Sequence, residues 1–171
     1  NHCMITLTRF NDGRAFVSGN RCERGAALML TGKSAPHSTL PNIYRWKYDQ
    51  IWHRRPLSPK QAVRGTVGIP RVLNMYEDFP YWHAFFGKLG YRVVTSSEQL
   101  REIPTEAMET IPSYSECFPA KLAHAHVADL AKHHPDFIWY PCIDKGPNEG
   151  STNSYNCPMV ASYPENIEAN M

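Results

Sequence analysis

The cysteines have the most distinctive chemistry in this chain, and three of the five lie in its second half. Cys117 stands just before a predicted helix, Cys142 directly follows the run FIWYP, and Cys157 lies in a polar loop beside a proline. The N-terminus of a helix stabilises negative charge, which favours a thiolate near Cys117. Three thiolates that met at one point would match an iron–sulfur cluster with an open or externally supplied fourth position.

The alternative is that these three cysteines are buried residues with a purely structural role. Free cysteine is among the most buried residue types. Cys117 and Cys142 are 25 residues apart and Cys157 follows 15 residues later, and these separations match no compact metal-binding motif. The spacing alone leaves both interpretations open.

Cys3 and Cys22 are weaker candidates for metal ligands, because two cysteines without a CxxC partner pair do not complete a zinc ribbon. They flank residues 4–19, whose alternating apolar and polar residues around Asp12-Gly13 predict a β-hairpin. In antiparallel strands centred on that turn the two cysteines would face one another, as ligands, as a disulfide or as free thiols.

The composition argues against several classes of function. The net charge is only +2, and no run of lysine and arginine exceeds two residues, so nothing favours nucleic-acid binding. The apolar runs are too short to span a membrane, and the N-terminal residues lack the basic and apolar regions of a secretory signal. Five cysteines without such a signal predict a cytoplasmic protein, because disulfides are rare in that compartment.

Other motifs add little. The nucleotide-binding and serine-hydrolase patterns GxGxxG, GxxxxGK[ST] and GxSxG are absent from the sequence. His124 and His126 point to different faces of a helix and cannot form a two-histidine site by themselves. Glu77, Asp78 and Glu116 are candidate acids, although solvation at the surface explains them equally well.

The elements that would position the three cysteines alternate between strands and helices. Strands are predicted at 66–73, 91–96 and 137–141, with a fourth candidate at 159–162. Helices are predicted at 76–90, at 119–134 and from about 164 onward. This alternation predicts a doubly wound α/β fold with a parallel sheet between helical layers. Cys117 and Cys142 would then lie at the carboxyl ends of the strands, where such sheets bind ligands.

Two parts are predicted along the chain. Residues 1–64 would form the hairpin and a helical connector, in which one helix face carries Tyr44, Tyr48, Ile51 and Trp52. Residues 65–171 would form the α/β domain. Because the sequence starts without methionine and stops within a helical pattern, we expect a piece of a longer polypeptide whose α/β domain is truncated at its C-terminus.

Five stretches of the sequence together resemble one family. They are GNRCERG (19–25), GTVGIPRVLNMYEDFPYWHAFFGKLGYRVV (65–94), SECFPAKLAHAH (115–126), YPCI (140–143) and NCPMVASYPENI (156–167). The family is the domain of unknown function found inside long acyl-CoA dehydratase activases, also called CoA-substrate-specific enzyme activases. The resemblance covers essentially the whole chain, and GIPRVLNMY (68–76) is a specific string within it.

That domain is similar in turn to the cluster-binding subunits of 2-hydroxyacyl-CoA dehydratases and to double-cubane proteins. Those proteins have flavodoxin-like or Rossmann-like α/β domains in which three cysteines per subunit hold a [4Fe–4S] cluster. The resemblance therefore implies that Cys117, Cys142 and Cys157 are the equivalent ligands. It also implies an ATP-driven activator that passes one electron at low potential to the cluster-bearing partner.

The sequence departs from this pattern because it has no ATP-binding signature and is too short for a complete two-lobed cluster subunit. We therefore expect an iron–sulfur electron-transfer domain of anaerobic metabolism that is not catalytic alone. Its expected partners are other domains of the same polypeptide, including an ATP-binding activator domain, and a dehydratase or acyl-CoA, but neither nucleic acid nor a membrane. The alternatives are a structural or interaction module with buried cysteines and a metal-free domain that binds the CoA thioester.

Overall fold

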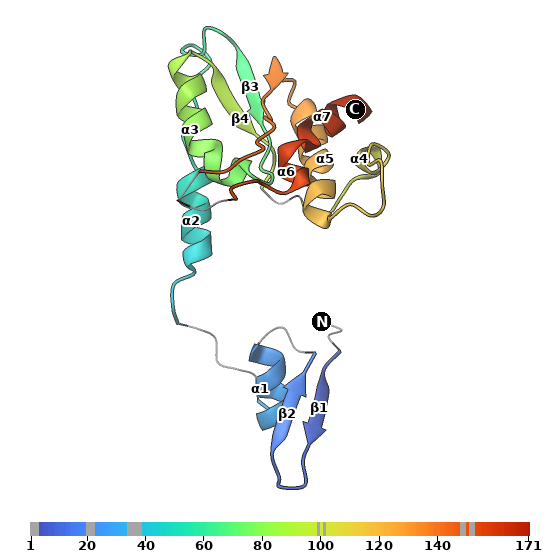
Figure 1. Ribbon diagram of the computed structural model, residues 1–171. Helices are drawn as coiled ribbons and strands as arrows, with labels where there is room; N and C mark the ends of the chain where they lie inside the picture. Colours follow the sequence, from blue (N-terminus) through green and yellow to red (C-terminus); the bar gives the residue numbers. More distant parts are fainter. Residues whose placement is uncertain are drawn as a thin grey trace. The chain divides into compact units, whose positions relative to one another are not determined.

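The computed structural model describes residues 4–19, 23–33, 39–98, 100, 102–147, 150 and 153–171. The chain divides into two compact units, Asn1–Asn42 and Ile43–Met171 (Figure 1). This division differs from the boundary predicted between residues 64 and 65. The reason is that helix α2 (Ile43–Trp52) buries Ile51 and Trp52 in the core of the second unit.

The first unit contains the predicted β-hairpin. Strand β1 (Thr6–Arg9) pairs antiparallel with β2 (Ala15–Ser18), and their register places Asp12 at the centre of the turn, half a residue before the predicted centre. The Asp12 carboxylate accepts a hydrogen bond of 3.0 Å from the backbone N–H of Arg14. Gly13 adopts φ +83°, a conformation that glycine reaches without steric cost.

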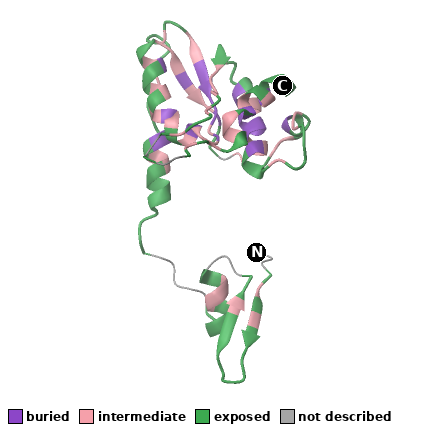
Figure 2. Ribbon diagram, in the orientation of Figure 1, coloured by how far each residue is buried: buried purple, intermediate pink, exposed green. Residues whose placement is uncertain are grey.

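Helix α1 (Glu23–Thr31) follows the hairpin, where the sequence patterns predicted no element. None of the described residues of this unit is buried, as the green and pink colours of Figure 2 show. Cys3 and Cys22, which were predicted to face one another, lie outside the described residues.

A parallel three-stranded sheet forms the centre of the second unit and confirms the predicted α/β fold. The strand order is β4 (Arg92–Thr95), β3 (Thr66–Ile69) and β5 (Phe137–Ile138), so β3 is central. The strands are shorter than predicted. Strand β3 ends at Ile69, since the next residue, Pro70, has no N–H to donate to a neighbouring strand.

Helices connect the strands. Helix α3 (Met75–Lys88) joins β3 to β4, and α4 (Thr105–Met108) and α5 (Phe118–Ala131) lie between β4 and β5. The chain continues after β5 with α6 (Pro158–Ala161) and α7 (Tyr163–Asn170). No helix of the described residues is long and apolar enough to cross a membrane.

The predicted fourth strand at 159–162 is wrong, because most of these residues belong to α6. Pro158 occupies the first helical position, where an N–H would lack a partner in any case. The N–H of Val160 then donates to the Cys157 carbonyl at 2.9 Å. A short apolar run therefore folds as a helical turn once a proline begins it.

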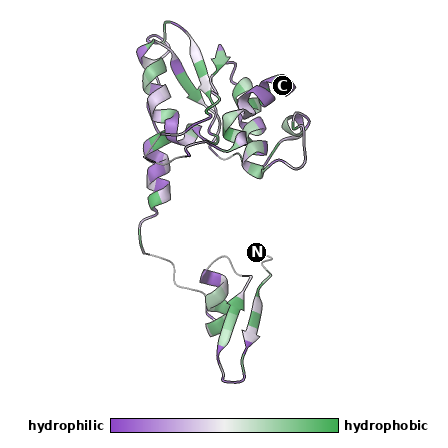
Figure 3. Cartoon of the chain, in the orientation of Figure 1, coloured by the Kyte–Doolittle hydropathy of each residue, from purple (hydrophilic) through white to green (hydrophobic). Residues whose placement is uncertain are grey.

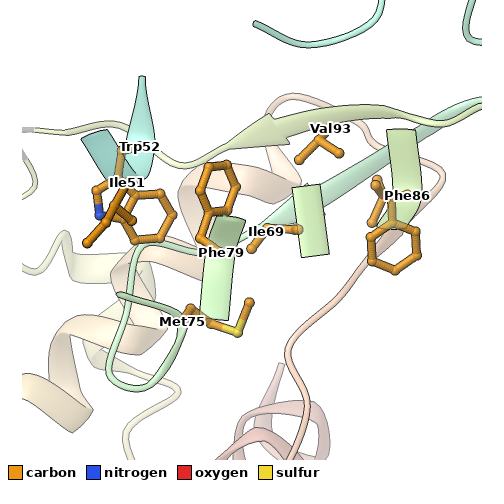
Figure 4. Close-up of a cluster of buried hydrophobic side chains, with 8 residues drawn as sticks. Ile51, Trp52, Ile69, Met75, Phe79, Phe86 and Val93 are labelled. Carbon is orange, nitrogen blue, oxygen red and sulfur yellow. The ribbon is translucent and has the colours of Figure 1, made fainter. Parts of the chain in front are cut away.

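Two clusters of buried side chains stabilise the second unit. The first, here called the aromatic cluster, joins α2, the sheet and α3 and consists of Ile51, Trp52, Val67, Ile69, Met75, Phe79, Phe86 and Val93 (Figure 4). The second, here called the α5–α7 cluster, consists of Val72, Ala120, Ala123, Tyr163 and Ile167. The helices carry both hydrophobic and hydrophilic residues (Figure 3), as expected of helices that bury one face.

Helix α5 approaches the central strand closely at Gly68. A Cβ atom at this position would lie 3.1 Å from the side chain of Pro135 and 3.3 Å from that of Leu130, which is fully buried in α5. Glycine in a strand often marks such a close approach, because any side chain would separate the two elements.

Candidate functional site

Two of the three candidate ligands occupy equivalent positions at the starts of two helices. Cys117 is the N-cap of α5 with φ −66° and ψ 150°, and Cys157 is the N-cap of α6 with φ −65° and ψ 154°. Their carbonyl groups accept N–H bonds of 3.1 Å from Lys121 and Ala161. Neither thiol makes a capping hydrogen bond, so both remain available for other chemistry.

Cys142 and Cys157 belong to segments that pair with each other. Asn156, which precedes Cys157, donates its backbone N–H to the Asp144 carbonyl at 2.9 Å. Its side-chain amide donates to the Ile143 carbonyl at 3.0 Å. These bonds hold the chain just after Cys142 beside the chain just before Cys157.

Cys117 lies beside a buried series of polar groups between α5 and α7. The Tyr163 hydroxyl donates to the carboxylate of Glu116, and Nε2 of His124 lies 2.9 Å from the same hydroxyl oxygen. Because tyrosine has only one proton to give, Nε2–H of His124 is the donor to Tyr163. Nδ1 of His124 lies 2.7 Å from Oγ1 of Thr110, whose hydroxyl donates to the Ala107 carbonyl at 2.8 Å. Burial lowers the pKa of His124, and the charge of Glu116 opposes part of that effect.

Each of the three cysteines has an electrostatic effect on one of two tyrosines, Tyr140 or Tyr163. Burial raises the pKa of Tyr140, and the negative charges of Cys142 and Cys157 raise it further. The pKa of Tyr163 is raised by burial, then by its bonded carboxylate and, to a smaller extent, by the charge of Cys117. Tyr163 belongs to the α5–α7 cluster, and Tyr140 packs against that cluster. Three cysteines from three segments therefore lie near one partly buried tyrosine and one buried tyrosine.

The Tyr140 hydroxyl is buried and has no hydrogen-bond partner among the described residues. Such a group is costly, since it has lost its water without gaining a protein partner. A cavity of about 360 Å³ borders both Tyr140 and Cys142, with apolar walls that include Ile138 and Ile167. A ligand near Cys142 would therefore find both space and an unused donor.

All three cysteines are free and exposed, which contradicts the interpretation that they are buried structural residues. Within the described ranges, however, no three histidine, cysteine, aspartate or glutamate side chains form a group that could hold a metal ion. The structure thus brings Cys117, Cys142 and Cys157 to one region of the unit without bringing their side chains together.

The two histidines of α5 bond to different partners, as their different helix faces predicted. Nδ1 of His126 lies 2.7 Å from Oγ of Ser96, which also accepts the backbone N–H of Arg71 at 2.9 Å. The Ser96 hydroxyl is therefore free to donate to His126. Burial lowers the pKa of His126 to about 4, so this histidine is neutral near pH 7. These bonds tie the ends of β3 and β4 to α5.

The roles of Tyr140 and Tyr163 were missed in the sequence, whereas Glu116 was named as a candidate acid but not as the partner of Tyr163. Tyr140 carries a usable signal, because it lies two residues before Cys142. Tyr163 carries none, since 39 residues separate it from the histidine that it contacts.

Comparison with known proteins assigns a family to most of the chain. Residues 66–171, from β3 to α7, match the sequence profile described as the CoA enzyme activase uncharacterised domain. No curated protein and no solved structure matches the chain. The match covers more than half of the 171 residues and confirms the family resemblance for residues 66–171, but not for the stretch GNRCERG at 19–25. The chain therefore belongs to the CoA enzyme activase uncharacterised domain family.

Proposed function

We propose that the α/β unit binds a [4Fe–4S] cluster through Cys117, Cys142 and Cys157 and relays single electrons within a CoA enzyme activase. The observation that carries this proposal is the position of three free, exposed thiols near the partly buried Tyr140 and the buried Tyr163. A purely structural role would favour burial of cysteine, which is among the most buried residue types.

The donor set fits the proposed group. Thiolate sulfur is the usual protein ligand of iron–sulfur clusters, and three thiolates leave one position for water, substrate or a residue of another domain. When bound, such a cluster supplies one-electron transfer at a potential set by its surroundings. Cys117 and Cys157 contribute defined backbone positions at the starts of α5 and α6.

Tyr140 is the residue that would tune this site. Its unpartnered hydroxyl lies within the electrostatic reach of Cys142 and Cys157, and its raised pKa keeps it protonated and able to donate. A hydrogen bond to a ligand thiolate withdraws electron density from the sulfur, so Tyr140 would act on the reduction potential rather than on the metal content.

Binding would require the three thiols to draw together, because the described side chains do not form a metal-holding group as they stand. The backbones of Cys117 and Cys157 are fixed by helix starts. Adjustment would fall on the thiol rotamers and on the chain between Cys142 and Cys157, which contains Gly146 and Gly150.

The proposed electron donor is an ATP-binding activator domain of the same polypeptide, and the proposed acceptor is a dehydratase that acts on an acyl-CoA. The family description, which names CoA enzyme activases, supports this assignment. The chain itself would contribute the relay between the two.

The experiment is anaerobic reconstitution of the full chain with iron and sulfide, followed by iron analysis and spectroscopy of the reduced protein. Cys117→Ser, Cys142→Ser and Cys157→Ser should each lose most of the bound iron, because each removes one thiolate. Ser154→Ala changes the same loop without removing a thiol, and it should keep the wild-type iron content.

Retention of the full iron content and an unchanged reduced-state spectrum in Cys157→Ser would overturn the three-thiolate site. Circular dichroism separates loss of ligand from loss of fold, because a serine at these exposed positions should leave the helical signal intact. If the wild-type protein bound no iron after reconstitution, and added CoA raised its melting temperature, the metal-free alternative would be supported instead.

A further inference from the structure

A second cavity of the α/β unit lies along β4, at the edge of the sheet, and has a volume of about 550 Å³. Its walls come from the end of α2, from α3, from β4 and from the residue after Pro70, and they include Trp52, Arg54, Arg71, Phe79, His83 and Thr95. No residue lines both this cavity and the one at Cys142.

Arg71 brings a half-buried positive charge to this cavity. Its Nη1 donates to the Tyr48 hydroxyl at 2.7 Å, while Nε and Nη2 donate to Oγ1 of Thr95 at 3.3 and 3.1 Å. The guanidinium carbon lies 5.2 Å from the ring centroid of Trp52. These contacts with neutral groups fix the guanidinium and use three of its five N–H donors, so two remain for a ligand.

The two arginines of the cavity have no anionic partner among the described residues, whereas His53, which also lines it, pairs with Asp49 and Glu98. Among the described residues no carboxylate forms an ion pair with Arg71 or Arg54. Glu98, whose pKa is lowered mainly by its hydrogen bond from Arg45 and least by the charge of Arg71, is bonded to Arg45 at 2.6 Å. Arg54 donates to two backbone carbonyls at the end of α2, at 3.1 and 3.2 Å. Two such cations in one cavity attract an anion.

Two buried nitrogen atoms beside these arginines also lack partners among the described residues. Trp52 is only 3% exposed, and its indole N–H, which can donate but not accept, has no acceptor. Nε2 of His83 is buried and unpartnered as well, and it is a donor in one neutral tautomer. Buried groups without partners are rare in native proteins, so the indole N–H calls for an acceptor, as does Nε2 of His83 in the tautomer in which it is a donor.

We propose that this cavity binds an organic phosphate. The phosphate group would meet Arg71 and Arg54, because its two negative charges and several acceptor oxygens suit guanidinium donors better than the single charge of a carboxylate. The organic part would lie against Val93 and Val94, two apolar side chains of β4 that line the cavity. The proposal is independent of the iron–sulfur site.

The test titrates the full chain with phenyl phosphate, inorganic phosphate and benzoate by calorimetry and follows the indole N–H signals by NMR. Phenyl phosphate should bind most tightly and should shift the Trp52 signal, which is assigned by its loss in Trp52→Phe. Arg54→Gln should weaken the binding by about tenfold or more, because it removes a charged hydrogen bond. Arg71→Lys should do the same, since lysine keeps the charge but loses the planar fork.

Arg55→Gln is the matched control, because it removes an equal charge one residue away and Arg55 lines a different cavity. Its affinity for phenyl phosphate should equal that of the wild type. The proposal is wrong if phenyl phosphate neither binds nor shifts the Trp52 signal, if benzoate binds more tightly, or if Arg54→Gln and Arg55→Gln weaken binding equally. If circular dichroism shows that Arg71→Lys does not fold, the affinities of Arg54→Gln and Arg55→Gln for phenyl phosphate decide the test.

Discussion

The aromatic cluster and the α5–α7 cluster fill the same unit by different physical means. In the aromatic cluster, Phe79 is 1% exposed and stacks on Trp52, so stability comes from apolar area and volume. In the α5–α7 cluster, two alanines leave room for Tyr163, whose hydroxyl joins a buried series of hydrogen bonds. Removing atoms should therefore be most damaging in the first cluster, and removing polar partners in the second.

The largest effect is expected from a cavity in the aromatic cluster. Phe79→Ala should lower the free energy of unfolding by about 3–5 kcal/mol, because the lost side chain leaves a void among rigid rings. Phe79→Leu, which refills most of the volume, should cost less. Urea denaturation followed by circular dichroism measures both, and equal losses in the two variants would contradict a role for volume.

Acid should lower the free energy of unfolding, because His126 in helix α5 is buried in its neutral form. Its pKa is lowered from 6.5 to about 4 by burial, with a smaller opposing effect of Asp129 and a supporting one of Arg71. As the pH falls from about 6.5 to about 4, the unfolded chain takes up a proton that the folded chain refuses. The free energy of unfolding should therefore fall by about 3 kcal/mol over this range.

Urea denaturation at several pH values measures this dependence. His126→Gln should remove most of the slope that belongs to this group. An unaltered slope in His126→Gln would contradict the assignment.

Removing one hydroxyl tests the polar part of the α5–α7 cluster. Tyr163→Phe should lower the free energy of unfolding by about 1–3 kcal/mol, because His124 and Glu116 each lose a buried partner. Tyr44→Phe removes the same atom from a side chain that is 81% exposed and serves as the control. If thermal denaturation shows equal stability for both variants, the buried series does not stabilise the fold.

The smallest effect on stability is expected from Tyr140→Phe. The Tyr140 hydroxyl has no partner among the described residues, so its removal should leave the unfolding free energy unchanged or raise it by up to about 1 kcal/mol. In reconstituted protein the same change should lower the reduction potential without loss of iron, since a donor to the thiolates is gone. Potentiometric titration measures the reduction potential, and iron analysis measures the iron content. A marked loss of stability in Tyr140→Phe would show that the hydroxyl has a hydrogen-bond partner.

Local patterns predicted most of the fold. The alternation around Asp12-Gly13 identified the hairpin, and the strand–helix alternation from Thr66 onward identified the parallel sheet. The errors came from prolines and from short apolar runs. Pro70 ends β3 early, and Pro158 turns an apparent strand into α6, because four apolar residues carry no period that separates the two structures.

The candidate site was only partly accessible to such reasoning. The three cysteines could be selected by type and by family resemblance, and the helix start near Cys117 was predicted from the following proline, whereas the one at Cys157 was missed. Their exposure and the tyrosines beside them depend on how α7 packs on α5, which joins residues far apart in sequence. No local pattern contains that information.

The close contact at Gly68 connects the central strand to α5, the helix that begins after Cys117. Helix α5 has 14 residues and is about 21 Å long, so it moves as a stiff rod when its contact with the central strand changes. A larger residue at position 68 would push on Leu130 near one end of the rod. Cys117 stands at the other end of the same helix, so a side chain larger than glycine at position 68 would alter the spacing of the thiols only if Leu130 could not give way.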